Sequence, residues 1–275
     1  MSEMGPDSAS TSRFRRLIYD YYAEHGRVLP WRLTNDPYCV FVSEVMLQQT
    51  QVGRVQEKYG EFIQDFPDFP ALADAPLASV LRVWQGLGYN RRALWLKCAA
   101  AAVMERFSGS LPTSPEALAT LPGIGSATAA SIAAFAFNRP VVFIETNIRS
   151  VFIHFFFHGK NGVRDAEIKE LVAETLDRDD PRSWYYALMD YGAMLKKTGE
   201  KGHRRSAGYR RQSPFRGSDR QVRGAILRLL VAGQTLSEAS LIGLLQSPAE
   251  KVRRNLNDLQ SEGFVRESEE GYTIV

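Results

Sequence analysis

The chain has 275 residues, of which 44% are hydrophobic and 24% charged, and its formal net charge is +3. This length and apolar content are sufficient for one or two globular domains. No apolar run approaches the ~20 residues of a membrane span, and the polar N-terminal segment lacks the apolar stretch of a signal peptide, so we expect a cytoplasmic protein with no membrane partner. The only cysteines, Cys39 and Cys98, stand in apolar contexts. We therefore expect buried thiols and no four-cysteine metal site.

Apolar side chains recur at helical spacing along most of the chain, and few stretches alternate with period two before residue 264. This pattern predicts an all-α fold. One helix has a clear start signal, because Ser114 offers a capping oxygen, Pro115 suits the first helical position and Glu116 places an acid in the first turn. The predicted helices cover 11–25, a segment after Asp36-Pro37, 53–65, 77–84, 91–107, 115–120, 126–137, 146–157, 165–177 and 182–197.

A glycine-containing turn separates two of these short helices at residues 121–125, Leu-Pro-Gly-Ile-Gly. Gly123 and Gly125 permit a tight turn and let backbone N–H groups approach a phosphate without an intervening side chain. The helix that follows is rich in Ala, Ser and Thr and can pack closely. The pattern predicts a helix-hairpin-helix that holds a phosphate, and the alternative is a simple helical hairpin.

The tail is predicted to form a separate domain at 219–275. Two helices, a third that opens with a capping box from Ser247 to Glu250, and a hairpin after Gly263 resemble a winged helix. Its third helix would face DNA if it acted as a recognition helix. The alternative is a small packing or partner-binding domain whose charges are only solvated. The polar residues of this third helix are Lys251, Arg253, Arg254 and Asn255.

Positive charge is concentrated between the two domains. Residues 201–224 carry a net charge of +7, which leaves −4 for the remainder of the chain. Arginine and lysine interleaved with Tyr209 and Phe215 suit a polyanion, because they displace counterions from phosphates. The alternative for this basic stretch is a solvated linker, which the predicted domain division places at 201–218.

Several sequence blocks together resemble the MutY adenine glycosylases of the helix-hairpin-helix (HhH-GPD) superfamily. They are LPWR at 29–32, DPY at 36–38, SEVMLQQTQV at 43–52, WQGLGYNRRA at 84–93 and MDYGAM at 189–194. The resemblance covers about residues 15–195. It implies a helix-hairpin-helix glycosylase domain at 10–200 with two helical subdomains, one at 30–140 and the other built from 10–29 and 141–200. It also implies base excision from double-stranded DNA by a nucleoid-associated enzyme, for which we expect a monomer.

Cutting an N-glycosidic bond requires a proton on the leaving base and a stabilised, oxocarbenium-like sugar. Two carboxylates in different environments can supply both. Glu44 lies among apolar residues in mid-helix, where desolvation favours a proton donor, and by resemblance it matches the glutamate that protonates adenine N7. Glu145 stands where the family has an aspartate that stabilises the sugar. The alternatives are a helix-surface glutamate at Glu44 and a pure capping role for Glu145.

The resemblance assigns further positions. Ala127 replaces the Schiff-base lysine of bifunctional relatives, so a monofunctional enzyme is expected. Gln49 and Tyr89 match residues that fill or distort the duplex beside the flipped base. The base pocket would contain Trp31, Arg32, Gln48 and Tyr186, the last in place of an adenine-reading glutamine. The remaining DNA-binding positions are Arg91, Gly123, Gly125, Ala127, Asn147, Arg204, Arg205, Arg210 and Arg211.

Two departures from the family affect cofactors and domains. Lys196 occupies the first ligand position of the usual iron–sulfur cluster, so we expect no cluster, no other cofactor and no metal apart from a monovalent cation that the hairpin backbone could hold. The winged-helix-like domain stands in place of the usual domain that recognises 8-oxoguanine. His154 and His158 lack neighbouring ligands and are expected in the core.

Three functions remain open from the sequence. The first is an adenine glycosylase acting opposite G or 8-oxoguanine. The second is a glycosylase for another mispaired or damaged base, suggested by Tyr186 and by the changed C-terminal domain. The third is a non-catalytic lesion-binding protein, against which the two acidic positions Glu44 and Glu145 argue.

Overall fold

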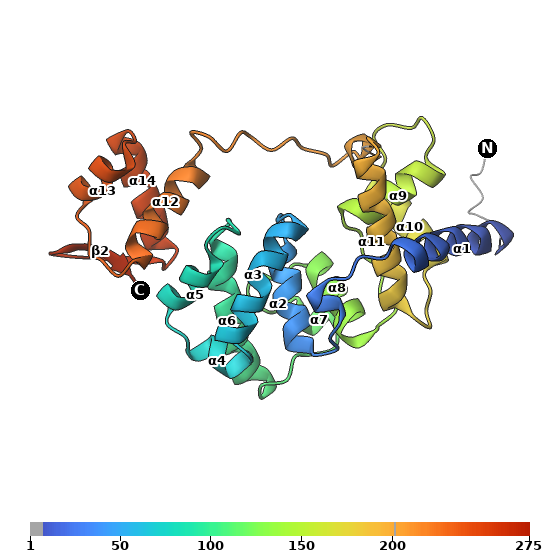
Figure 1. Cartoon of the computed structure of the whole chain (residues 1–275), viewed down its shortest axis with the longest axis horizontal. Helices are drawn as coiled ribbons and strands as arrows, with labels where there is room; N and C mark the ends of the chain where they lie inside the picture. The colour runs from blue at the N-terminus through green and yellow to red at the C-terminus, as the bar shows by residue number, and fades with distance from the viewer. Residues whose placement is uncertain (1–7, 201) are drawn as a thin grey trace. The chain divides into compact units, whose positions relative to one another are not determined.

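The structure is a computed structural model that describes residues 8–200 and 202–275. The elements up to the basic segment are α1 (Ser8–His25), η1 (Pro30–Arg32), α2 (Pro37–Leu47), α3 (Val52–Asp65), α4 (Phe69–Asp74), α5 (Leu77–Trp84), α6 (Arg91–Phe107), α7 (Pro115–Leu118), α8 (Ser126–Phe137), α9 (Thr146–Phe156), α10 (Asp165–Thr175), α11 (Pro181–Lys197) and η2 (Gly202–Arg205). The tail contains α12 (Asp219–Val231), α13 (Glu238–Leu245), α14 (Ala249–Ser261), β1 (Val265–Ser268) and β2 (Gly271–Ile274) (Figure 1).

The predicted all-α fold is confirmed, and the predicted helices are present with shifts of a few residues at their ends. Ser114 caps α7 as expected, accepting a hydrogen bond from the backbone N–H of Ala117 at 3.2 Å. The helix α4 was not among the predicted helices, although a start signal is present. Asp68 caps this helix by accepting from the N–H of Ala71, and Pro70 stands in its first turn.

The chain folds into two compact units. Unit 1 draws its described residues from Met1–Val40, Thr113–Ala119 and Gly125–Arg211, and unit 2 draws its residues from Phe41–Pro112, Thr120–Ile124 and Gln212–Val275. The division passes through α2 and through the turn of the hairpin. Glu145 belongs to unit 1, whereas Glu44 belongs to unit 2.

Unit 1 is built around α9 and α11, with α1 along α11 and η2 against α9 (Figure 1). Phe14 of α1 joins these helices through an aromatic cluster. Its ring makes edge contacts with Phe152 at 5.6 Å and with Trp184 at 5.8 Å between centroids. Edge-to-face packing of this kind adds to the free energy gained from burying the rings.

Unit 2 contains two groups of helices. In the first, α4 and α5 pack on α6, and α3 packs on α5, where the buried rings of Phe62 and Trp84 meet at 6.0 Å between centroids. In the tail, α12 packs against α14 and β2, and β1 pairs antiparallel with β2 from Val265 opposite Ile274. Three helices followed by a hairpin confirm the predicted winged-helix-like arrangement.

Four sequence-based expectations are wrong. Cys39 is partly exposed and Cys98 is exposed, so neither thiol is fully buried. His158 is exposed just beyond the end of α9 and is not in the core. Ser247 does not cap α14: its hydroxyl donates to the carbonyl of Leu245, and the helix begins after Pro248 without a side-chain cap.

No helix of the described residues combines the length and apolar character needed to cross a membrane.

Candidate active site

Glu145 is the N-cap of α9, and its carboxylate is held by the first turn of that helix. Oε1 accepts the backbone N–H of Asn147 at 2.7 Å and that of Ile148 at 2.8 Å. Oε2 accepts one further bond, from the side-chain amide of Asn147 at 3.2 Å. The capping role considered as an alternative is therefore present, and it fixes one oxygen firmly while the other keeps unused acceptor capacity.

Burial and hydrogen bonding act on Glu145 in opposite directions. Burial raises the pKa of this carboxyl above its ordinary value, while the N–H groups of Asn147 and Ile148 lower it and offset part of that effect. The positive end of the α9 dipole favours the anion in the same way. The site thus holds a desolvated carboxylate whose negative charge is supported by main-chain groups, as required of a group that stabilises a developing cation.

Gly192 of α11 lets the first turn of α9 approach. A Cβ atom at Gly192 would lie 2.5 Å from the carbonyl oxygen of Asn147, a distance that no side chain tolerates. Only glycine permits the two helices to meet at this point. The glycine of the MDYGAM block therefore contributes to the position of Asn147 and, through it, of Glu145.

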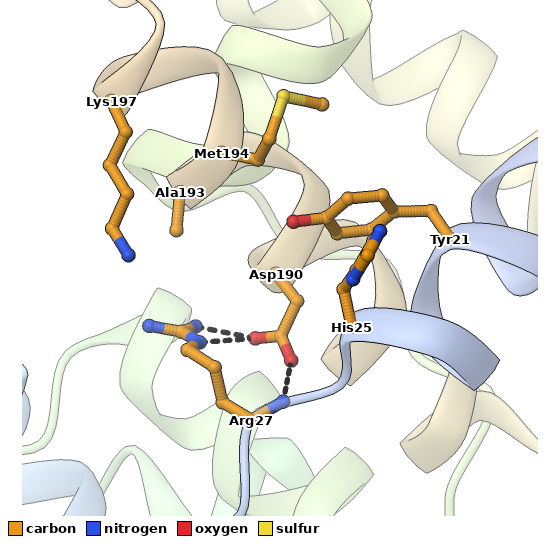
Figure 2. Close-up of a pocket in the computed structure, with 7 residues that line it drawn as sticks. All are labelled: Tyr21, His25, Arg27, Asp190, Ala193, Met194 and Lys197. Carbon is orange, nitrogen blue, oxygen red and sulfur yellow. Dashed lines mark hydrogen bonds and ion pairs between the residues drawn. The ribbon is translucent and has the colours of Figure 1, made fainter.

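Asp190 of the same block organises a buried cluster of charges in unit 1. Its carboxylate accepts two bonds from Arg32, each of 2.9 Å, and bonds of 2.6 and 2.7 Å from the side chain and the backbone N–H of Arg27. The Asp190 side chain is 1% exposed and that of Arg32 5%. Figure 2 shows Asp190 between Arg27 and the aromatic pair of Tyr21 and His25.

The hollow beside Asp190 is too small for a nucleobase. It measures about 110 Å³ and is lined by Tyr21, His25, Arg27, Asp190, Ala193, Met194 and Lys197 (Figure 2). Pockets for small organic ligands are usually ≈ 300–1,000 Å³. This cavity is therefore not a base pocket in the structure.

Three of the predicted pocket residues, Trp31, Arg32 and Tyr186, belong to unit 1, where Arg32 and Tyr186 contact each other. Trp31 is 3% exposed and Tyr186 7% exposed. The ring of Tyr186 stacks on Phe135 with 4.6 Å between centroids, and the Arg32 guanidinium lies 4.3 Å from the Tyr186 centroid. The structure thus places the Tyr186 ring between an aromatic ring and a cation.

Glu44 lies on α2 in unit 2, with its side chain partly exposed between the buried Val45 and Ser43. Gln48, four residues on, is also partly exposed, so the two side chains share one face of the helix. The structure thus leaves Glu44 and Gln48 partly accessible on the same face of α2.

Gln49 and Tyr89 stand on two loops of unit 2 and share an unusual backbone conformation. Their φ angles are 53° and 48°, in the left-handed region that non-glycine residues rarely adopt. The Tyr89 hydroxyl accepts bonds from Gln212 and, at 3.0 Å, from Arg220. Tyr89, which was predicted to fill or distort the duplex, is therefore hydrogen-bonded to the segment that leads into the tail and to α12.

Charges of the tail are mostly paired with carboxylates. Glu262 accepts bonds from Arg91 and, at 2.6 Å, from Arg223. On α14, the proposed recognition helix, Arg253 bonds to Glu238 and Arg254 to Asp219. Asn255 is 1% exposed and lies against α12. These contacts favour the packing interpretation of this helix.

The hairpin turn has two glycines with different surroundings. Gly123 has φ +74°, and a Cβ there would lie 2.7 Å from the Cβ of Trp95. Gly125 has φ −78° and open space around it, directly before α8. The exposed Ala127 follows in the first turn of α8, whose N–H groups have no acceptor within the helix. A phosphate can approach this turn only where no side chain blocks it.

The basic segment is divided between a structural and an exposed part. Arg205 donates to the carbonyls of Phe157 at 2.9 Å and Ile153 at 3.1 Å, so it caps the C-terminal end of α9. By contrast, Arg204, Arg210 and Arg211 are exposed. The segment that follows the MDYGAM helix is thus anchored on α9 by Arg205.

Comparison with known proteins agrees with this architecture. Residues 42–178 match the model of the HhH-GPD superfamily of base excision DNA repair proteins. The adenine DNA glycosylase of Mycolicibacterium smegmatis is 33% identical over 273 residues, which cover 92% of this chain and 93% of that protein. The chain belongs to the HhH-GPD superfamily. It is a DNA N-glycosylase.

Two further relatives of this glycosylase match about two thirds of the chain. The adenine DNA glycosylase of Buchnera aphidicola is 36% identical over 191 residues, or 68% of this chain, which spans only about half (54%) of that protein. The structure of a thermostable thymine-DNA glycosylase aligns with 70% of this chain and 94% of that protein's chain, with a TM-score of 0.61 and 26% sequence identity.

Four residues of this HhH-GPD enzyme support the site without having been singled out from the sequence: Arg27, Arg92, Asp190 and Gly192. Asp190 and Gly192 lie within the MDYGAM block. An acid and a glycine inside an otherwise apolar helix were the signals that could have marked them. Arg92 stands in the WQGLGYNRRA block; the structure buries it against the carbonyls of Val45 and Met46 beside Glu44, and no local signal indicated that burial. Arg27 precedes LPWR and carries no local signal.

Proposed function

We propose that this DNA glycosylase removes adenine mispaired with G or 8-oxoguanine by hydrolysis of the N-glycosidic bond. The observation that most supports this substrate is the similarity to a named adenine DNA glycosylase along 92% of the chain. Of the two carboxylates proposed for the chemistry, Glu44 lies within the sequence blocks that carry the resemblance, whereas Glu145 lies outside them and stands where the family has an aspartate.

In the proposed mechanism, Glu44 protonates the leaving adenine and Glu145 stabilises the oxocarbenium-like sugar as the bond breaks. Water then adds to the sugar. Because Ala127 has no amine, no Schiff base forms and the backbone of the DNA is left uncut. Glu145 is one methylene longer than the family aspartate, and the two backbone N–H groups on its Oε1 provide a means of holding the longer side chain in position.

We also propose that the enzyme works without an iron–sulfur cluster. The chain has two cysteines, whereas such clusters are usually held by four. Cys39 is on α2 and Cys98 on α6, and neither is near Lys196 in sequence. The segment anchored by Arg205 stands where the family has its cluster loop. We infer that a monomer binds double-stranded DNA through this segment and the hairpin, in the cytoplasm at the nucleoid.

A second candidate substrate is another mispaired base, such as thymine. Two observations favour it: the structural similarity to a thymine-DNA glycosylase, and Tyr186 in place of a glutamine. A tyrosine has one hydroxyl where glutamine has a two-ended amide, so it reads a base differently.

A panel of duplexes with single mispairs distinguishes the two candidates. Single-turnover base release is measured on A opposite G, A opposite 8-oxoguanine and T opposite G, with Glu44→Gln as the inactive control. Adenine release from the first two supports the proposal. Release of thymine alone would support the second candidate and rule out the first. Tight binding of the mispaired duplexes without release of a base from any of them would indicate a lesion-binding protein.

A further inference from the structure

Arg92 of α6 is a buried cation whose hydrogen bonds all go to neutral oxygen atoms, while its Nε–H has no hydrogen-bond partner in the part of the chain that the structure describes. The residue is 5% exposed. Its guanidinium donates to the carbonyls of Val45 at 3.0 Å and Met46 at 2.8 Å, and to the Thr50 hydroxyl at 2.8 Å. It also donates to the carbonyls of Leu87 at 3.3 Å and Gly88 at 3.0 Å. Among the described residues, no carboxylate forms an ion pair with Arg92.

A buried charge without a counterion is unfavourable unless hydrogen bonds replace its lost hydration. Burial lowers the pKa of Arg92 to about 10, so the side chain stays protonated at neutral pH. The planar guanidinium suits this position because it presents five N–H donors in a fixed geometry. Lysine has three donors on one atom and cannot reach acceptors on both sides.

The acceptors belong to two segments that are distant in sequence. Val45, Met46 and Thr50 lie at the C-terminal end of α2 and in the turn after it, where helix carbonyls lack intrahelical partners. Leu87 and Gly88 lie in the loop between α5 and α6. Arg92 therefore joins the end of α2 to this loop.

Each of the two segments that Arg92 joins contains one of the residues predicted to contact the duplex, Gln49 in the first and Tyr89 in the second. Gln49 directly precedes Thr50, and Tyr89 directly follows Gly88. Both have positive φ, a conformation that persists only where the surroundings impose it. The Arg92 guanidinium also lies 5.6 Å from the Tyr89 ring centroid. One side chain thus constrains both strained positions.

We infer that Arg92 is a positioning residue that holds Gln49 and Tyr89 in one fixed relation, so that they enter the duplex together when the target base is flipped. This inference rests on the proposed function and on the duplex contacts that the family resemblance implies for Gln49 and Tyr89. It adds the group that sets their geometry. Base flipping, not the bond cleavage that follows, is the step that depends on Arg92.

The test compares Arg92→Lys with Arg106→Lys. Arg106 lies on the same helix, where it bonds to Thr120 on the protein surface. Base release is measured in single turnovers from a mispaired duplex and from a duplex in which the target base faces an abasic site, where little pairing opposes flipping. We expect Arg92→Lys to slow release from the mispair about tenfold or more and release opposite the abasic site less than about threefold. Arg106→Lys leaves both rates unchanged.

Coupling to Tyr89 separates positioning from a general loss of structure. When Tyr89 is already replaced by Ala, adding Arg92→Lys is expected to slow base release from the mispair by less than about twofold relative to Tyr89→Ala alone. The reason is that the side chain positioned by Arg92 is no longer present. Additive effects, or equal slowing on both duplexes, would overturn the inference. Thr50→Ala removes a single acceptor and provides a milder variant, expected to act in the same direction, if Arg92→Lys does not fold.

Flipping is also followed directly, by the fluorescence of 2-aminopurine next to the target base. Wild type and Arg106→Lys are expected to raise this fluorescence on binding, and Arg92→Lys to bind with a much smaller rise. If wild type flips the base but releases neither adenine nor thymine, the proposed function fails while the role of Arg92 is still decided. An unchanged rise with Arg92→Lys would contradict that role.

Discussion

The carboxylate of Asp190 and the guanidinium of Arg32 form two parallel hydrogen bonds of 2.9 Å each across 158 residues of sequence. Both side chains are almost fully buried, and Arg27 adds a second cation to the same carboxylate. This pair connects the segment after α1 to α11. It also holds the guanidinium that lies over the Tyr186 ring.

Replacing Asp190 with Asn is expected to reduce the free energy of unfolding by about 3–5 kcal/mol, because it leaves a buried arginine without its counterion. Asp165→Asn is the control, since Asp165 pairs with Arg149 but is 50% exposed. Its loss is expected to cost at most ~1 kcal/mol. Denaturant unfolding measures both. Equal effects of the two substitutions would show that burial of the Asp190 pair has no energetic consequence.

Glu145→Gln is expected to abolish base release while raising thermal stability at neutral pH. The folded state holds the Glu145 proton more tightly than the unfolded chain, because burial raises its pKa above 4.5. Wild type therefore loses stability as pH rises through the folded pKa, whereas the variant does not. The gain should disappear towards pH 4. Glu167, whose pKa is lowered by Lys160 and the Arg164 N–H, is the control; Glu167→Gln should not stabilise the protein. A Tm difference for Glu145→Gln that is constant with pH would contradict this account.

Glu44→Gln should stop base release and leave duplex binding nearly unchanged. The substitution removes a proton donor but no cation that could contact phosphate. Single-turnover kinetics and binding of an uncleaved duplex test the two parts separately. A rate of base release near that of wild type would exclude Glu44 as the general acid.

The arginines of the basic segment are expected to separate into two groups. Replacing Arg204, Arg210 and Arg211 with Ala should weaken binding to all duplexes and reduce the slope of log affinity against log salt by up to ~0.9 per lost phosphate contact. The Tm should not change. Arg205→Ala should lower the Tm, because Arg205 caps α9. If the triple variant retains the affinity and salt slope of wild type, the segment is a linker and not a DNA-binding arm.

The two hairpin glycines should respond differently to alanine. Gly123→Ala is expected to destabilise the protein by about 1–3 kcal/mol, because a Cβ at positive φ would collide with Trp95. Gly125→Ala should leave stability unchanged, since space around it is open, but weaken duplex binding where the new methyl meets the phosphate. Unfolding and binding measurements on both variants check this. Loss of stability with Gly125→Ala would mean that its role is in folding.

The helices and the hairpin turn could be predicted from the amino-acid sequence alone. These features depend on local signals: helical spacing of apolar residues, capping residues such as Ser114, and glycines at a turn. Even the missed α4 had its signal in Asp68 and Pro70. Short motifs of this kind keep their meaning wherever the chain places them, because their physics involves neighbouring residues only.

The contacts between distant groups became evident from the folded structure alone. Arg92 and Arg205 are both arginines in polar or basic stretches, yet one is buried among carbonyl groups and the other caps a helix. Gly192 is required because α9 crosses α11 at its position. Such roles depend on packing between elements that are separated by tens of residues, and helical periodicity carries no information about which faces come into contact.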